Sequence, residues 1–402
     1  MSTPAIPQTE RLYSLDAARA IAALAVVFQH WEHFLSLERF AAPVEASPLY
    51  WLFQPAYDKG ARAVTFFFCL SGFIFYWLYS QKVHEKVVGP ATFAVLRLSR
   101  LYPLHLLTLL LCLALQWPLI AMLGHPFIYP EHDAYHFGLN LFLVQYWGFE
   151  AGYSFNGPSW SISVEIFLYI AFFFACRFTR PALWQCLALA AAAMLLARFS
   201  VLAAAAQTFF IGGAVFFLYR MLASRWTALR HLALVALVVA AWALVPMLAN
   251  PEALQGLRGV LGDGPAGNVA AAGVGALAER QYEFVLFPLT VLALALSEVA
   301  WKRIPWRWLH DLGNMSFGIY LLHFPLQLAL AWAALAFAFP ADFFTWPVTL
   351  ALFIAVLLGA AAISYRAFER PAMDALRRAW RQRRGQSRHP VAAKSTSPAA
   401  PS

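Results

Sequence analysis

The run LYPLHLLTLLLCLALQWPLIAML, residues 101–123, contains no Asp, Glu, Lys or Arg. A helix needs about 20 predominantly apolar residues to cross the hydrocarbon core of a bilayer, so this run predicts a membrane-spanning helix. The whole chain has the same character. Of its 402 residues, 61% are hydrophobic and only 12% are charged, which is too little charge to cover the surface of a soluble domain.

Similar apolar runs lie on both sides of this stretch. A shorter apolar piece at residues 138–147 is too brief to cross a bilayer, and we expect it to lie in or re-enter the membrane face. The predicted spans cover residues 12–35, 62–80, 101–123, 159–176, 182–202, 205–221, 231–249, 282–299, 315–338 and 345–366. We therefore predict an all-α, polytopic membrane helix bundle of about ten transmembrane helices.

The Lys and Arg residues predict the orientation of the bundle. With the N-terminus in the cytoplasm, most of them fall in cytoplasmic loops and in the C-terminal tail, as the positive-inside rule requires. This pattern places both termini in the cytoplasm. It also explains the net charge of +9 without nucleic acid, because the charges sit in short loops between apolar runs. Residues 1–371 are predicted to form the membrane domain, and residues 372–402 a basic, disordered cytoplasmic tail.

The four cysteines lie in or at the edge of apolar runs. Their spacing fits neither a metal site nor a secreted disulfide framework, so we expect them to pack as small hydrophobic residues and predict no metal site. The first apolar run has no signal-peptide cleavage pattern, which predicts a retained first span.

Ionisable residues inside spans are costly and are therefore candidates for function. The first span contains Asp16, Arg19 and His30. Arg19 and His30 are eleven positions apart, a helical rotation of about 1100° that places both on one face, about 16 Å apart along the axis. One helix could thus contact a phosphate at one end and a thioester at the other. The alternative is that both side chains simply reach toward the membrane surfaces.

The second and third spans offer two further candidates. Ser71-Gly72 places a hydroxyl and a close backbone approach inside the membrane, although small residues also serve helix packing. Arg97 and Arg100 precede Pro103, so we expect them near a helix start. There they could bind phosphate, or they could be ordinary cytoplasmic charges.

The fourth and ninth spans contain an acid and a histidine at depth. Trp160 and Glu165 open the fourth span, and a buried carboxylate there needs a partner, whether for catalysis or only for structure. Tyr320 and His323 share a face of the ninth span, just before Pro325. They predict either a cavity lining or a packed pair.

Taken together in order, these segments resemble the acyltransferase 3 family of membrane acyltransferases over residues 11–371. The resemblance rests on Arg11 to Ala20, the pair Arg19 and His30, Phe67 to Phe73, Arg97 and Arg100 with Pro103, Trp160-Ser161 with Glu165, Gly318-Ile319-Tyr320 with His323 and Pro325, and Glu369-Arg370-Pro371.

The resemblance implies an enzyme of the bacterial inner membrane that uses acyl-CoA. The expected reaction moves an acyl group, with acetyl the first choice, to a hydroxyl of an extracytoplasmic carbohydrate or glycolipid, as in polysaccharide O-acetylation. His30 is the implied catalytic residue. A polytopic transporter or flippase is the alternative, and acyl-CoA dependence separates the two.

Combined with the positions above, this gives an expected set of site residues. For catalysis we expect His30, with Glu165 or Asp16 fixing its tautomer. Asp16 could more simply pair with Arg19, three residues later. The sequence does not separate direct transfer from an acyl-histidine intermediate. For acyl-CoA binding we expect Arg19, Arg97, Arg100, Ser71 and Gly72. For the acceptor we expect Trp160, Tyr320 and His323.

Overall fold

The computed structural model describes residues 12–248, 264, 280–301 and 310–386. These residues are helical apart from loops, and the one extended pairing among them is an isolated bridge between Glu131 and Ser154. The prediction of an all-α bundle is confirmed. Most of the predicted loop at residues 250–281 lies outside the described residues.

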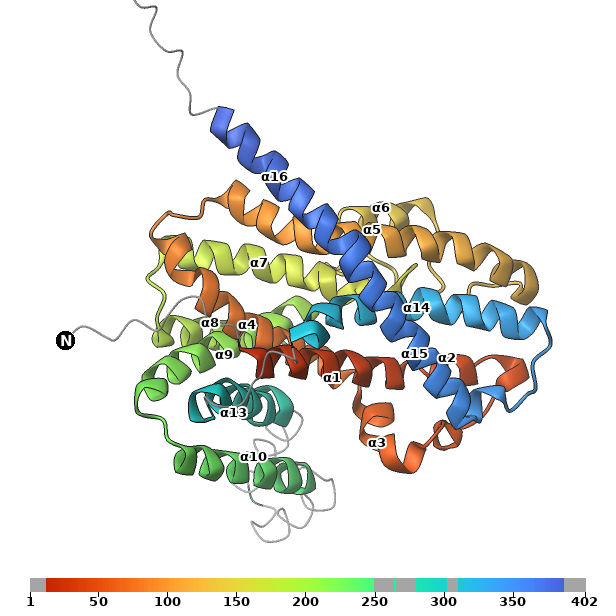
Figure 1. Ribbon diagram of the computed structural model, residues 1–402, viewed down its shortest axis with the longest axis horizontal. Coiled ribbons are helices and arrows are strands. Elements are labelled where there is room, and N and C mark those ends of the chain that lie inside the picture. The colour runs from red at the N-terminus through yellow and green to blue at the C-terminus, as the bar shows by residue number, and fades with distance from the viewer. Residues whose placement is uncertain (1–11, 249–263, 265–279, 302–309, 387–402) are drawn as a thin grey trace, which may run out of the picture.

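Figure 1 shows the described helices in chain order. Their bounds are α1 (Tyr13–Gln29), α2 (Glu32–Leu35), α3 (Tyr50–Lys59), α4 (Arg62–His84), α5 (Pro90–Leu123), α6 (Ala134–Leu141), α7 (Trp160–Phe178), α8 (Leu183–Leu196), α9 (Val201–Leu222), α10 (Ala228–Leu248), α13 (Phe287–Ala300), α14 (His310–Ala336), α15 (Pro347–Ile363) and α16 (Arg370–Gln386). Three short segments matter below: η3 (Gly157–Ser159), η5 (Tyr282–Leu286) and η8 (Ser364–Glu369).

Each predicted span overlaps one of these helices, but not all are equally long. By length and composition, 7 helices of the described chain are apolar enough to cross a membrane. Helices α1 and α8 are shorter, with 17 and 14 residues. The apolar part of α10 is also short, at Ala228–Leu244. The four cysteines are buried and unpaired, as expected for packing residues.

The start of α5 differs from the prediction. The helix begins at Pro90, with Gly89 as its N-cap, and Pro103 lies inside it. Proline is well suited to the first turn of a helix, and Pro90 meets that condition better than Pro103. Arg97 and Arg100 therefore lie about two and about three turns inside α5, and the predicted phosphate site at a helix N-terminus is wrong.

The predicted disordered tail is also wrong for its first part. Residues 370–386 form α16, which continues from α15 through η8 and crosses α5 (Figure 1). Ala, Leu, Met, Gln and Arg are strong helix formers. The high charge of this segment reflects a solvated helix face and does not prevent folding. Residues 387–402 lie outside the described residues.

Helix α1 is central to the bundle, with α14 and α4 packed beside it (Figure 1). Close contact between α1 and α14 uses Gly313, where an added Cβ would lie 2.3 Å from the Cβ of Asp16. Helix α14 contains Pro325, which cannot donate a hydrogen bond to the carbonyl of Leu321. The side-chain amide of Asn156 donates to that carbonyl instead, at 3.0 Å. The loop before α7 thus completes α14 near its histidine.

Helices α4 and α9 cross at very short distance through glycines. A Cβ on Gly72 would lie 1.8 Å from the carbonyl oxygen of Phe209, and one on Gly212 would lie 1.8 Å from that of Cys69. Gly72 is buried in this contact. It therefore packs two helices together and leaves no room for a cofactor, which corrects its predicted role in acyl-CoA binding.

We expect Gly72→Ala to destabilise the protein strongly. The added methyl group must push α4 and α9 apart, and overpacking of this kind costs about 1–3 kcal/mol or more. The thermal unfolding temperature of the detergent-solubilised chain, measured by size-exclusion fluorescence after heating, should fall. Gly359→Ala is the matched control, because nothing lies within 4 Å of its Cβ position. Equal unfolding temperatures for the two variants would contradict the close crossing.

Candidate active site

Three histidine rings lie together where α1 ends. His30 is the C-cap of α1, and its ring is stacked between His33, 4.8 Å away between centroids, and His323 of α14, 5.0 Å away. Nδ1 of His30 lies 2.8 Å from Nε2 of His323. His323 is fully buried, whereas His30 is half-buried. The sequence predicted His30 and His323 separately, and the structure joins them.

The hydrogen bonds define the tautomers of this pair. Nδ1 of His323 lies 2.6 Å from the carbonyl oxygen of Tyr320, which can only accept, so this nitrogen carries the proton. Nε2 of neutral His323 is then an acceptor, and His30 donates to it from Nδ1. Neutral His30 is therefore left with its lone pair on Nε2, and no other described residue bonds to that nitrogen. This is the form that a general base requires.

Gln327 of α14 supports the cluster in a second way. Its amide nitrogen donates to the carbonyl oxygen of His30 at 2.7 Å, and its Oε1 accepts from Nδ1 of His33 at 3.0 Å. Gln327 is fully buried. Neither Gln327 nor His33 was among the site residues predicted from the sequence. Gln327 lies four residues after His323 on the same face of α14, and His33 lies three residues after His30, in α2.

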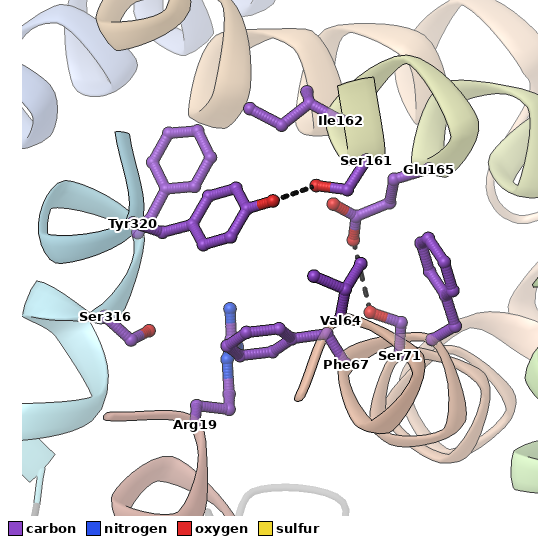
Figure 2. A pocket seen from close by; sticks show the side chains of 11 residues that line it. Arg19, Val64, Phe67, Ser71, Ser161, Ile162, Glu165, Ser316 and Tyr320 are labelled. Atoms are coloured by element: carbon purple, nitrogen blue, oxygen red, sulfur yellow. Dashed lines mark hydrogen bonds between the residues drawn. The ribbon is translucent and has the colours of Figure 1, made fainter. Parts of the chain in front are cut away.

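A small cavity of about 60 Å³ lies one helical turn from His323. We call it the Glu165 cavity. Its polar lining comes from α1, α4, α7 and α14 and consists of Arg19, Ser71, Ser161, Glu165, Ser316 and Tyr320 (Figure 2). Figure 2 shows the Arg19 side chain pointing into this space. His30 is not among its lining residues.

Glu165 and Tyr320 are held firmly on opposite sides of this cavity (Figure 2). Ser71 and Tyr169 both donate to Oε1 of Glu165, at 3.2 and 2.5 Å. Tyr320 donates to the carbonyl oxygen of Pro158 at 2.7 Å and accepts from Ser161 at 2.8 Å. Arg19 interacts electrostatically with Arg100, Asp16 and Glu165, but it makes no hydrogen bond to another described residue. A guanidinium in this state can receive an anionic ligand.

Three guanidiniums gather where α16 crosses α5. Arg97 lies over the ring of Tyr79, 4.5 Å from its centroid, and donates to the Tyr79 hydroxyl, while its buried Nε has no partner. Arg377 of α16 donates to Oγ of Ser99 and to the carbonyl of Leu96, both at 3.1 Å. Arg377 is also repelled by the like charges of Arg97 and Arg100. No carboxylate of the described residues forms an ion pair with any of the three.

Several predicted partnerships are not formed. Glu165 bonds to Ser71 and Tyr169 rather than to His30. Asp16 lies fourteen residues before His30 on α1, about 21 Å along the axis, and cannot orient it. His323 is fully buried and contacts Nδ1 of His30, which suits a positioning role, while its predicted contact with the acceptor stays a prediction. Arg19 and His30 do share the face of α1 that meets α14, as predicted.

The acidic and histidine side chains at the start of α6 form a separate cluster. Glu131, Asp133 and His136 have ligand atoms within 4.8 Å of one another. Both nitrogens of His136 are already used, since Nδ1 donates to Asp133 and Nε2 accepts from the Ala151 amide. Hydrogen bonds from the backbone and side chain of His136 lower the pKa of Asp133. The cluster is explained as the N-cap of α6.

Comparison with known proteins gives the same class as the sequence motifs. Acyltransferase MdmB of Streptomyces mycarofaciens is 35% identical over 199 residues, which are 47% of this chain and 46% of that protein. Protein 2 in picA locus of Rhizobium radiobacter is 35% identical over 105 residues, 26% of this chain and 46% of that protein. The chain thus matches about half the length of these relatives. No solved structure matches it.

The family match is much more extensive than these pairwise matches. The acyltransferase domain covers residues 12–365, which include α1 to α15 and every residue of the histidine cluster and the Glu165 cavity. The predicted resemblance is therefore confirmed: the chain belongs to the acyltransferase 3 family of membrane acyltransferases.

Proposed function

We propose that this protein moves an acetyl group from cytoplasmic acetyl-CoA to a hydroxyl of an extracytoplasmic carbohydrate or glycolipid, in the bacterial inner membrane. His30 removes the proton from the acceptor hydroxyl as that oxygen attacks the thioester carbonyl. The bond between the acetyl carbon and sulfur then breaks, and the CoA thiolate leaves and takes up the proton that His30 removed. The observation that carries this proposal is the hydrogen bond from Nδ1 of His30 to His323, which leaves Nε2 of His30 with its lone pair.

The cationic groups support a donor that enters from the opposite end of α1. Arg97, Arg100 and Arg377 form a positive cluster at the crossing of α5 and α16, suited to the phosphates of CoA. The next cation along the proposed path of the donor is Arg19, which lines the Glu165 cavity and is close enough to Arg100 for their charges to interact. From Arg19 to His30 is about 16 Å along α1, a distance that an extended pantetheine arm can span. The thioester then reaches His30 past Tyr320.

The transporter alternative lacks comparable support. Polar groups inside a bundle also occur in transporters, but the family match extends over most of this chain and is to acyltransferases. A transporter has no reason to bind acyl-CoA or to hold one histidine tautomer. Binding of acetyl-CoA to the purified chain is therefore the first test of the donor part of the proposal.

We expect Arg100→Gln to weaken acetyl-CoA binding by about 10–100-fold, because a hydrogen bond between charged groups contributes about 1.5–3 kcal/mol. Arg100 makes no hydrogen bond or ion pair with another described residue, so its loss should leave folding intact. Isothermal titration of acetyl-CoA into the full chain in detergent gives the dissociation constant directly.

Arg378→Gln is the matched control, because it removes the same charge from an exposed position on α16. It should change the dissociation constant only slightly, and less still at high salt, where exposed charges are screened. No binding of acetyl-CoA to the native chain would overturn the donor assignment. Equal losses for both variants would show a general charge effect in place of a site.

A further inference from the structure

A second, larger cavity lies at the N-terminal ends of α4, α7 and α9. Its volume is about 390 Å³, within the range of ordinary ligand sites, about 300–1,000 Å³. We call it the Arg280 cavity. Its lining includes Arg62, Thr65, Trp160, Gln207, Arg280 and Glu283. In the orientation predicted from the Lys and Arg residues, this end of the bundle faces away from the cytoplasm.

The charges of this cavity do not balance. Arg62 and Glu283 form one long ion pair, 3.5 Å between Nη1 and Oε1. Arg280 donates to a neutral group, Oε1 of Gln207, at 2.7 Å, and no carboxylate of the described residues pairs with it. The lining thus contains two guanidiniums but only one carboxylate, and that carboxylate is paired with Arg62. An arginine held in place by a neutral amide, beside open space, keeps its remaining donors for an anion.

The cavity also has an aromatic wall and hydroxyl groups. Trp160 packs against Tyr146, 4.9 Å between ring centroids, which fixes the position of the indole. No hydrogen bond to another described residue engages the indole nitrogen of Trp160 or the hydroxyl of Thr65. A fixed indole offers a flat apolar face together with one polar donor. This combination suits a sugar ring, which has an apolar C–H face and a polar edge.

The Arg280 cavity adjoins the Glu165 cavity. Phe68 lines both of them. Helix α7 contributes Trp160 to the Arg280 cavity, and it contributes Ser161 and Glu165 to the Glu165 cavity. A ligand in the Arg280 cavity therefore lies next to the region through which the proposed donor passes, and on the other side from the arginines of α5 and α16.

We propose that the Arg280 cavity binds an acidic sugar unit of the acceptor. Arg280 and Arg62 hold its carboxylate or phosphate, and Trp160 packs against its ring. This inference rests on the proposed function in taking the ligand to be the carbohydrate acceptor. It goes beyond that function in naming an acidic acceptor and the residues that select it.

Saturation-transfer NMR tests this site without requiring transferase activity. The full chain is placed in phosphatidylcholine nanodiscs, because sugar-headed detergents would compete for the cavity. The probes are glucuronic acid, glucose 1-phosphate and, as the neutral match, glucose. We expect both acidic sugars to bind at least about 10-fold more tightly than glucose, since a charge-assisted hydrogen bond contributes about 1.5–3 kcal/mol.

Three variants locate the binding. Arg280→Gln should remove the preference for acidic sugars, and Arg280→Lys should keep part of it. Trp160→Ala should weaken the binding of all three probes. Arg39→Gln is the matched control, because Arg39 is an exposed arginine bound to the carbonyl of Phe339, outside this cavity. It should leave binding unchanged.

The binding results distinguish failure of the sugar site from failure of the proposed function. If the native chain binds glucuronic acid no better than glucose, the inference is overturned whatever the variants do. If neither acidic sugar binds but phosphatidylglycerol, added to the nanodiscs as a further probe, does bind, the cavity holds a lipid headgroup and the inference is also overturned. Sugar binding that depends on Arg280, in a chain with no acetyl transfer, supports this site while rejecting the proposed function. Acetyl transfer to a neutral acceptor, in a chain that does not bind acidic sugars, supports the proposed function while rejecting this site.

Discussion

Replacing His30 by asparagine should lower kcat by about 10²–10⁴-fold, the usual contribution of a general base. Asparagine places an amide nitrogen near the position of Nδ1, so the hydrogen bond to His323 can persist while the lone pair of Nε2 is lost. The Michaelis constant for acetyl-CoA should change little, because the arginines of α5 and α16 are untouched. Release of free CoA thiol in the presence of acceptor measures both quantities.

His105→Gln is the control for loss of a buried membrane histidine. His105 lies inside α5, and its Nε2 bonds to the carbonyl of Asn140 at 2.9 Å. Its replacement should change stability and protein yield more than kcat per folded molecule. If the two variants lose the same modest activity at equal folded fraction, His30 has no special chemical role. The base would then be another group.

His323→Leu should lower kcat by about 10–100-fold, with the Michaelis constant for acetyl-CoA unchanged. The leucine cannot accept the proton of His30 Nδ1, so His30 loses both its orientation and its preferred tautomer. A hydrogen bond to a group that becomes charged contributes about 1.5–3 kcal/mol, which corresponds to this range in rate.

His323→Gln separates this positioning role from simple packing. The amide oxygen of glutamine can accept from His30, so most of kcat should return, whereas a leucine of similar size should not rescue it. Equal activity of the glutamine and leucine variants would contradict the role of the hydrogen bond. A change confined to the Michaelis constant for the acceptor would return His323 to the predicted acceptor site.

The fold could be predicted from sequence because a membrane imposes strong rules. Apolar runs of sufficient length must be helical, and each predicted range overlaps a helix. Two predictions were wrong, the start of α5 and the disorder of residues 372–386, and each error has a local cause. The predicted start of α5 relied on Pro103, although Pro90 occupies the first turn. The tail was judged by its charge, although its helix formers and the contact of Arg377 with Ser99 fold it onto α5.

The candidate site could be predicted only in part, because periodicity describes one helix at a time. The shared face of Arg19 and His30 follows from the turn angle of a single helix. The pairing of His30 with His323 joins residues 293 positions apart, and nothing in either helix alone specifies it. The same holds for Gly72, which no pattern distinguishes as a packing residue until α9 lies against it.

Transfer of the acyl group in cells tests whether His30 is the catalytic base of an acetyltransferase. The native chain, the His30→Asn variant and the His105→Gln variant are expressed in a host from which the gene is deleted, and intact envelope glycans and glycolipids are compared by mass spectrometry. We expect an added acetyl mass with the native chain and with His105→Gln, and none with His30→Asn. The same acetyl mass with His30→Asn, at equal protein level, would contradict this expectation.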